Sequence, residues 1–299
     1  VFWDDNIGAN LTYAKALFRE LAPLNKWWTS QTTAVSVQDD EFLELAAASG
    51  CKALFIGLES VNEPSLAEAG KKHNQVAAYG DLLRRFHSHG IAVQSGIMFG
   101  FDEDTPDVFA RTVDAMGDIG LDSATVSLMV PFPGLPAYEK LARDGRIIDD
   151  DWRHYNGKTH VVHQPHNLTP DQLMSGYEWA KSQFYSPASI TRRLAQSRTG
   201  LWWNIPRNLG YMRGITGEIK ARAAMHEQHG LARSRLEVPG PDTVHIDEFS
   251  AFPVHHGHGA WKKLLRTSLN LWGCSRKLKW PDWLNTCHRA RRSFSARIR

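Results

Sequence analysis

The first half of the sequence alternates short, β-rich apolar runs with longer segments of helical period. The runs that suit strands cover residues 27–33, 53–58, 91–100 and 124–130, and Phe2-Trp3 fits the end of a further strand. The helical patterns between them cover residues 11–21, 41–49, 76–88 and 105–116. Strands separated by helices in this way require right-handed crossovers, which predicts a parallel sheet.

The ends of these strands distinguish between two kinds of parallel sheet. A doubly wound nucleotide-binding sheet concentrates its motif in one glycine-rich turn, and the sequence contains no G-x-G-x-x-G. A β/α barrel builds its site from several strand ends on one face. The predicted strands finish in polar, glycine or proline residues, at Asp4-Asp5-Asn6, Gln31, Glu59-Ser60, Gly100-Phe101-Asp102 and Pro131-Phe132-Pro133-Gly134. We therefore predict an α/β fold: a partial (β/α) barrel of parallel strands with a C-terminal helical extension.

The alternation stops after Gly134, and this divides the chain into three predicted regions. Residues 1–135 form the partial barrel. Residues 136–228 form the helical extension, with helical patterns at 136–145, 169–184 and 187–195. Residues 229–299 are rich in Gly, Pro, His and Arg without a period, which predicts a basic and poorly ordered tail.

The positive charge of the chain comes from residues 261–299. This segment holds 11 Lys and Arg residues and one acidic residue, Asp282, so its net charge is +10, against +3 for the whole chain. Interleaved tryptophans would let it contact an anionic membrane surface or nucleic acid. Because no nucleic-acid motif accompanies the charge, nucleic-acid binding is not expected, and a poorly structured extension is the simpler interpretation.

The sequence also restricts where the protein works. No run approaches the roughly 18 apolar residues of a membrane-spanning helix, and the N-terminus lacks the pattern of a signal peptide. A cytoplasmic protein is expected. Its three cysteines, Cys51, Cys274 and Cys287, are too widely spaced for a disulfide framework or a zinc ribbon. Cys51 enters a predicted strand, where a small buried apolar role is expected.

Four motifs occur in order along the first half of the chain: Phe2-Trp3-Asp4-Asp5-Asn6, Gly57-Leu58-Glu59-Ser60-Val61, Gly96-Ile97-Met98-Phe99-Gly100-Phe101 and Pro131-Phe132-Pro133-Gly134. In these motifs and their spacing the chain resembles the radical S-adenosylmethionine (radical SAM) superfamily. It looks most like the branch that places a cobalamin-binding domain before the barrel. Later elements, Gly145-Arg146-Ile147, Asp151-Trp152 and Leu168-Thr169-Pro170, extend the resemblance over roughly residues 1–185.

The resemblance implies ligand-binding roles at the first two strand ends. Asp4, Asp5 and Asn6 match the position that binds the amino group of SAM, and their oxygens are suitable acceptors for an ammonium group. The alternative is that Asp5 or Asn6 caps the helix that starts near Asn10. Gln31, on the next strand end, is a weaker candidate for contacting the ligand or substrate.

The resemblance also assigns roles at the later strand ends. Glu59 and Ser60 match the position that contacts the ribose hydroxyls or the methionyl part of SAM, although Glu59 could instead form a structural ion pair with Lys71 or Arg84. Gly96 and Gly100 would let the backbone approach the adenine, or would simply bend their strand. The turn that begins at Pro131 matches the family's adenine contact. No catalytic or metal-ligating residue is assigned to this chain.

The chain departs from the family in its cysteines. The family holds a [4Fe–4S] cluster with a C-x-x-x-C-x-x-C loop after the first barrel strand, and this sequence contains no such arrangement. The interpretation is a truncated radical SAM enzyme, inactive alone, whose first strand and cluster loop are missing. Its parent would use SAM, the cluster and a donor such as ferredoxin or flavodoxin on a small-molecule substrate, with cobalamin-assisted methyl transfer left open.

Two alternatives belong to other functional classes. One is a cluster-free pseudo-enzyme that acts as a binding or scaffold module. The other is an ordinary barrel hydrolase or lyase that needs no iron.

Two further groups of residues could carry a function of their own. Histidines crowd two loops, at His154, His160, His163 and His166 and at His255, His256 and His258. Their irregular spacing favours solvated loop histidines over a metal site. Trp202 and Trp203 stand near Arg207 and Arg213, where ordinary helix packing is expected and a membrane or partner surface is the alternative.

Overall fold

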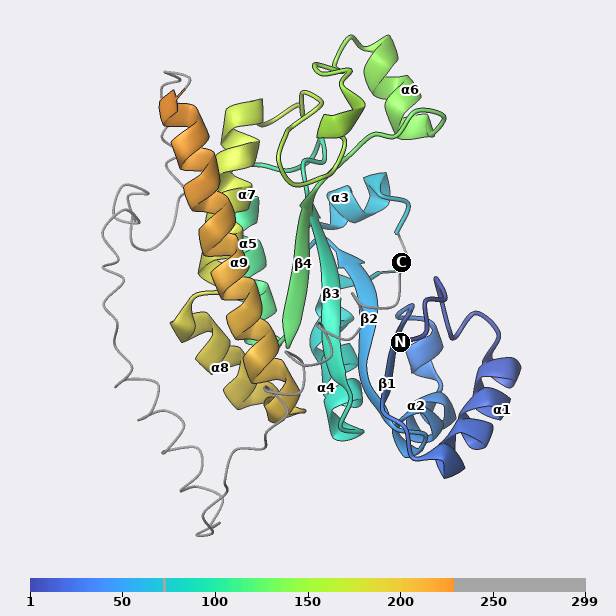
Figure 1. Cartoon of the computed structure of the whole chain (residues 1–299). Helices are drawn as coiled ribbons and strands as arrows, with labels where there is room; N and C mark the ends of the chain where they lie inside the picture. The colour runs from blue at the N-terminus through green and yellow to red at the C-terminus, as the bar shows by residue number, and fades with distance from the viewer. Residues whose placement is uncertain (72–73, 229–299) are drawn as a thin grey trace, which may run out of the picture. The chain divides into compact units, whose positions relative to one another are not determined.

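The computed structural model describes residues 1–71 and 74–228. Within them lies one sheet of four parallel strands in the order β1-β2-β3-β4, namely β1 (Trp28–Thr32), β2 (Cys51–Glu59), β3 (Ala92–Phe99) and β4 (Ser123–Leu128) (Figure 1). Neighbours in space are neighbours in sequence, as right-handed β-α-β crossovers produce. The predicted α/β fold with a partial barrel of parallel strands is confirmed.

Helices connect and flank these strands. They are α1 (Leu11–Leu21), α2 (Asp40–Ala48), α3 (Glu63–Glu68), α4 (Tyr79–Ser88), α5 (Val108–Asp118), α6 (Pro136–Arg143), α7 (Pro170–Phe184), α8 (Pro187–Ser197) and α9 (Leu201–Gln228). Local sequence explains several starts: Asn10, Asp39 and Thr169 cap α1, α2 and α7 through side-chain oxygens that accept backbone N–H groups. The short α3 and the helical span of α9 were not predicted as elements.

The N-terminal segment differs from the prediction. Phe2 and Trp3 form no strand, although the segment lies along the outer edge of β1. The Phe2 N–H donates to the Thr29 carbonyl at 2.9 Å, and the Ile7 N–H donates to the Gln31 carbonyl at 3.0 Å. Only these two backbone hydrogen bonds join the described N-terminal segment to β1, too few for a ladder. The segment still places Asp4, Asp5 and Asn6 beside the carboxyl end of β1.

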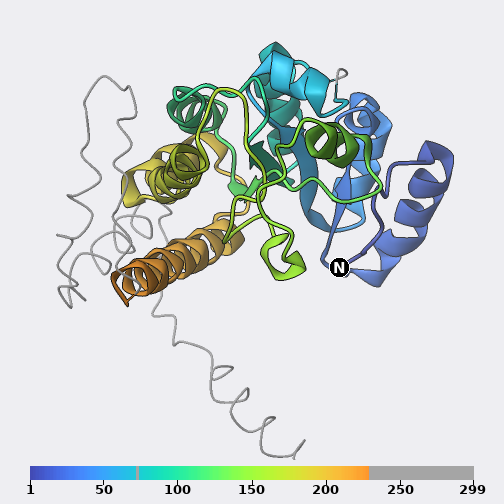
Figure 2. The same ribbon diagram turned by 90° about the horizontal axis from the view of Figure 1, so that it is seen from above.

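The two faces of the sheet differ in burial. One face is covered by helices, and its side chains, such as Leu54, Ile56 and Val93, are fully buried in the core. The intervening side chains of each strand point to the other face, which is only half-buried. We call it the open face; its residues are Thr29, Gln31, Phe55, Gly57, Glu59, Gln94, Gly96, Met98, Thr125 and Ser127. Figure 2 shows α9 on the side of the sheet away from α3, and the Gln94 amide of the open face reaches the Tyr211 hydroxyl of α9 at 3.2 Å.

The outer edge of β4 is covered by side-chain and loop contacts. The Tyr185 hydroxyl accepts from the Ala124 N–H at 3.0 Å and donates to the Ala124 carbonyl at 2.6 Å. Nearer the end of the strand, the Leu128 N–H donates to the Gly157 carbonyl at 2.8 Å. These contacts satisfy backbone groups that a fifth strand would otherwise pair, so the edge does not remain open.

A buried polar network attaches α8 and α9 to the start of β4. Arg193 is fully buried, and its guanidinium donates to the carbonyls of Leu121 and Asp122 at 2.7 and 3.0 Å. The Asp122 carboxylate accepts from the Asn204 amide at 2.9 Å. Burial lowers the pKa of Arg193 to about 10, so it keeps its charge at neutral pH. The helical extension is thus bonded directly to the sheet.

The last predicted region, 229–299, lies outside the described residues. In the part of the chain that the structure does describe, no helix is both long enough and apolar enough to cross a membrane.

Candidate functional site at the strand ends

Glu59 closes β2 in an unusual backbone conformation. Its φ of 68° lies in the left-handed region, which non-glycine residues rarely adopt, and the pairing of β2 with β3 shifts register between Gly57 and Glu59. As a result the Glu59 side chain turns back over the open face instead of continuing the strand. Its carboxylate occupies the space that a Cβ on Gly57 would need. Backbone strain of this kind persists only where the surrounding structure enforces it, and it is common at functional sites.

Two glycines form the floor beneath this carboxylate. Gly57 and Gly96 are directly paired across β2 and β3. A Cβ on Gly96 would stand 3.1 Å from the Phe55 ring and 3.8 Å from the second Glu59 carboxylate oxygen. The space above the paired glycines on the open face is therefore taken by an aromatic ring and a carboxylate. Backbone can be approached closely only where no Cβ intervenes.

The turn after Glu59 is held by hydrogen bonds to its carbonyls. The Tyr79 hydroxyl donates to the carbonyls of Leu58 and Ser60 at 2.8 and 3.1 Å, and the Asn74 amide donates to the Gly57 carbonyl at 3.0 Å. Burial, and then the charge of Glu59, raise the pKa of Tyr79, so its hydroxyl stays protonated and remains a donor. This scaffold explains how the strained conformation persists.

Glu59 also has a cationic partner. The Lys71 ammonium lies 3.5 Å from one Glu59 carboxylate oxygen, and the Glu59 side chain is 18% exposed. Arg84, the other partner considered from the sequence, pairs with Asp81 instead. The ion pair with Lys71 is long for a hydrogen-bonded contact and half-exposed on the lysine side, so it leaves the carboxylate able to accept from a ligand.

The N-terminal candidates lie at the neighbouring edge. Asp4 and Asp5 are exposed, whereas the Asn6 side chain accepts from the Gly8 N–H at 3.0 Å and from the Thr32 hydroxyl at 3.1 Å. The alternative that Asp5 or Asn6 caps the first helix is wrong, because Asn10 itself caps α1. Asn6 therefore holds a local turn, and the two aspartates keep their carboxylates exposed at this edge.

The other predicted site residues divide between the open face and the interior. Gln31 lies on the open face in register with Phe55. Ser60 is buried, and its hydroxyl accepts from the Asn62 N–H at 3.0 Å. Gly100 has a φ of 109° and packs against Leu173 on the covered side.

Pro131 is also buried, in the turn after β4. The structure thus brings Gln31, Glu59 and Gly96 together on one face, and places Ser60, Gly100 and Pro131 within the framework behind it.

Asp102, just beyond β3, joins α3, α6 and the loops at 146 and 166, segments that the sequence alone did not connect. Its carboxylate pairs with Arg146, with Lys140 at 2.9 Å and with His166 at 3.6 Å, and its N–H donates to the Glu68 carboxylate at 2.9 Å. Burial opposes ionisation, but the hydrogen bonds from Arg146 and Lys140 outweigh it and hold the pKa of Asp102 well below its usual range. Burial and the charge of Asp102 raise the pKa of Glu68.

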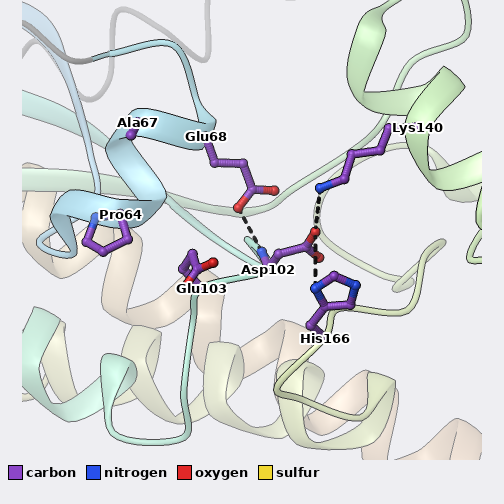
Figure 3. A pocket seen from close by; sticks show the side chains of 7 residues that line it. All are labelled: Pro64, Ala67, Glu68, Asp102, Glu103, Lys140 and His166. Carbon is purple, nitrogen blue, oxygen red and sulfur yellow. Dashed lines mark hydrogen bonds and ion pairs between the residues drawn. The ribbon is translucent and has the colours of Figure 1, made fainter.

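These groups line a pocket of about 510 Å³ between α3 and α6, together with Pro64, Ala67 and Glu103. In Figure 3 the Asp102 carboxylate lies between Lys140 and His166, and Glu68 approaches the Asp102 backbone from α3. The polar groups in it are committed to one another, so we interpret the pocket as a junction between α3, α6 and the strand end. Two features of the sequence indicated this junction: Asp102 follows a predicted strand, and Arg146 belongs to the Gly145-Arg146-Ile147 element that resembles the family.

The described cysteine does not suit an iron–sulfur cluster. Cys51 is buried at the start of β2, at the opposite end of the strand from Glu59, and burial raises the pKa of its thiol. Its expected apolar role is confirmed. No group of three His, Cys, Asp or Glu side chains within residues 1–71 and 74–228 could hold a metal ion. Cys274 and Cys287 lie outside the described residues; those that the structure does describe do not fit the cluster.

One of the loop histidines contradicts the expectation of solvated side chains. His163 is fully buried, and its Nε2 lies 2.9 Å from the Gly100 carbonyl. Burial lowers the pKa of His163, so at neutral pH the ring is uncharged and Nε2–H donates. His154 pairs with Asp149 at 2.6 Å, and His166 is exposed beside Asp102. The cluster at 255–258 lies outside the described residues.

Several known proteins similar to this chain are methyltransferases. Bacteriochlorophyllide d C-12(1)-methyltransferase of Chlorobaculum tepidum is 31% identical over 193 residues, which cover 64% of this chain and 42% of that protein. Hopanoid C-2 methylase of Rhodopseudomonas palustris is 26% identical over 198 residues, covering 64% of this chain and 36% of that protein. The radical SAM methyltransferase TsrM of Kitasatospora setae, solved with tryptophan substrate and a SAM analogue, has 19% identity and a TM-score of 0.46 over 62% of this chain and 43% of that chain.

The chain is related to the radical SAM superfamily. No family model matches it. The chain spans less than half the length of these radical SAM relatives, so their complete activities do not transfer to it directly.

Proposed function

We propose that this chain is the SAM-binding part of a radical SAM methyltransferase that acts on a small-molecule substrate. The observation that carries the proposal is the Glu59 carboxylate, turned back over the paired glycines Gly57 and Gly96 on the open face. A carboxylate held in this way can accept both hydroxyls of a ribose, and the Phe55 ring borders it on the open face. Asp4 and Asp5, exposed at the adjacent edge, would accept from the SAM ammonium.

The residues present therefore fit SAM in the chemistry of their donors and acceptors. Bound SAM would supply the methyl group or the adenosyl group on which the family's chemistry depends. The chain's own residues bind and orient it: Glu59 at the ribose, Gln31 and Gly96 along the open face, and the backbone of the turns at Ser60, Gly100 and Pro131 behind them. Tyr79 and Asn74 hold the turn that keeps Glu59 in place.

For the whole protein, the proposal includes a [4Fe–4S] cluster ligated by residues other than Cys51 and reduced by a donor such as ferredoxin or flavodoxin, with cobalamin as a further cofactor to be tested. Methyl transfer is supported by the names of the relatives. Anaerobic reconstitution of this chain with iron and sulfide should give no [4Fe–4S] absorbance. A cluster spectrum abolished by Cys51→Ala would contradict the proposal.

SAM binding tests the site directly. Titration of the chain with SAM, followed by calorimetry or by saturation-transfer NMR, should detect binding. Glu59→Gln should weaken it by about tenfold or more, because hydrogen bonds to a charged acceptor contribute about 1.5–3 kcal/mol. Glu63→Gln, which neutralises an exposed carboxylate four residues away on α3, is the matched control and should bind as the parent chain does.

Absence of SAM binding at millimolar ligand, or equal affinity of the Glu59 and Glu63 variants, would reject the proposed site.

A cluster-free binding module is the second candidate, because no group of three or more His, Cys, Asp or Glu side chains within the described residues could hold a metal ion. It shares the SAM-binding prediction but requires that no longer reading frame upstream of Val1 encode the C-x-x-x-C-x-x-C segment. Sequencing the genomic DNA before Val1 separates the two functions.

A further inference from the structure

Three tryptophans from distant parts of the chain meet at the end of the sheet opposite the proposed SAM site. Trp27 immediately precedes β1, and Trp202 and Trp203 begin α9. The ring centres of Trp27 and Trp202 lie 4.8 Å apart, and those of Trp202 and Trp203 lie 6.1 Å apart. Figure 1 shows the strands and α9 beginning at this same end of the molecule. We call these three residues the tryptophan patch.

The patch is exposed, which corrects the expectation of ordinary helix packing. Trp27 is 69% exposed, Trp202 55% and Trp203 42%, although aromatic rings usually bury most of their surface. Three large rings that contact one another and still face water are not part of the core, because burial would remove their apolar surface from water. A contiguous exposed apolar patch of this kind marks an interaction surface.

The charges around the patch are basic. The segments at this end of the sheet are 22–27, 49–52, 89–91, 119–122 and 198–200, and their exposed or half-exposed charged residues are Lys26, Lys52 and Arg198, with His89 beside them. Of the acidic residues here, Asp122 is fully buried and bonded to His87 and Asn204, and the exposed Asp118 at the end of α5 is paired with Arg192. The Lys52 ammonium lies 5.7 Å from the centre of the Trp27 ring. The described surface here therefore combines tryptophan rings with a positive rim.

We propose that the tryptophan patch and its basic rim dock this chain onto an anionic membrane surface. Tryptophan prefers the interface between headgroups and acyl chains, where its ring is apolar and its N–H remains hydrated. Lys26, Lys52 and Arg198 would be attracted to the negative lipid headgroups. This orientation leaves the open face and its strand ends at the other end of the sheet, accessible to ligand.

Two other occupants fit the patch less well. In a symmetric dimer built on this surface, the basic rim would face its own copy, and like charges would repel. Single-stranded nucleic acid stacks its bases on rings displayed separately along a groove. Here the rings are packed against one another.

Vesicle sedimentation of the full chain tests the proposal. The parent chain should bind vesicles of phosphatidylcholine with phosphatidylserine more strongly than vesicles of phosphatidylcholine alone, and added salt should weaken the binding. The triple variant Trp27→Ala/Trp202→Ala/Trp203→Ala should reduce partitioning by about tenfold or more, through loss of buried ring surface. Trp152→Ala, which removes a tryptophan that is 63% exposed elsewhere, is the matched control and should bind as the parent does.

Each remaining outcome overturns the proposal. Unchanged partitioning of the triple variant would show that other parts of the chain carry any membrane binding. A dimer seen by light scattering without vesicles and lost in the triple variant would assign the patch to self-association. Binding of a single-stranded oligonucleotide that depends on the three tryptophans, without vesicle binding, would assign it to nucleic acid. Thermal melting of each variant confirms that it is folded.

Discussion

The Glu59 carboxylate lies in the space that a side chain on Gly57 would fill, two residues earlier on the same strand. In a regular strand, residues two positions apart point to the same face, side by side and without overlapping. Here the positive φ of Glu59 and the register shift beside it bring the carboxylate back over the strand. The Glu59 carboxylate can therefore lie here only because residue 57 is glycine.

This relationship predicts that Gly57→Ala weakens SAM binding without removing any polar group. The added methyl would displace the Glu59 carboxylate, so we expect a loss of about tenfold, as for Glu59→Gln. Calorimetry would measure it, with Gly214→Ala as control because position 214 has open space for a Cβ. An unchanged affinity for Gly57→Ala, alongside a loss for Glu59→Gln, would place the carboxylate elsewhere when ligand is bound.

Asp102→Asn should destabilise the protein by about 3 kcal/mol, because it leaves the Arg146 guanidinium, 11% exposed, without its carboxylate partner. Urea unfolding would measure the change in free energy. Asp118→Asn, which removes the exposed partner of Arg192, should stay within about 0.5 kcal/mol of the parent. Equal effects of the two variants would show that Asp102 is not the anchor that its contacts indicate.

Tyr185→Phe should destabilise the protein by about 1–3 kcal/mol. It removes the hydroxyl that satisfies both the N–H and the carbonyl of Ala124 at the edge of β4, and leaves those groups buried without a partner. Hydrogen exchange at the Ala124 amide should accelerate relative to the parent. Tyr13→Phe, at a tyrosine that is 67% exposed, should change neither quantity.

Stability should fall as the pH drops from about 7 towards 5, in part because of His163. Burial holds its folded-state pKa below the unfolded value of about 6.5, so the unfolded chain binds the proton first. The stabilisation is fully present above that pH and is lost as the pH falls through it. In His163→Gln, whose amide can still donate to the Gly100 carbonyl, the slope over this range should be smaller.

Urea unfolding at several pH values measures this slope for both proteins. Glu68 and Asp104, whose pKa values burial raises, are common to both, so the difference in slope reports His163 alone. Identical slopes would mean that His163 does not take up a proton on unfolding.

The strands and most helices could be predicted because local sequence decides them. The run at 53–58 is continuous and apolar, as a strand needs when helices cover it, and it became β2. Asp39 and Thr169 offer oxygens to the first turns of α2 and α7 within three residues. The chain segment at 201–228 gave no such pattern, since Pro206 and three glycines interrupt it, and α9 forms through packing on the core.

The candidate site was predictable in its residue types but not in its shape. Glu59 stood out as a carboxylate that ends an apolar strand, and Gly96 as a glycine within one. Gly57 was missed, although a glycine two residues before that glutamate shares its face and was the available indication. The positive φ that unites them depends on Tyr79 and Asn74, which lie well along the chain from β2.

The sequence by itself determined the order of strands and helices, the parallel sheet and the polar strand ends, because hydrophobic period and capping act over a few residues. Only the tertiary structure decided which of those ends face outward. It buried His163, paired Asp102 with Arg146, turned Glu59 over Gly57 and brought Trp27 against Trp202. These outcomes depend on contacts between segments far apart in the chain, and burial, charge pairing and backbone strain are set by neighbours that no local pattern specifies.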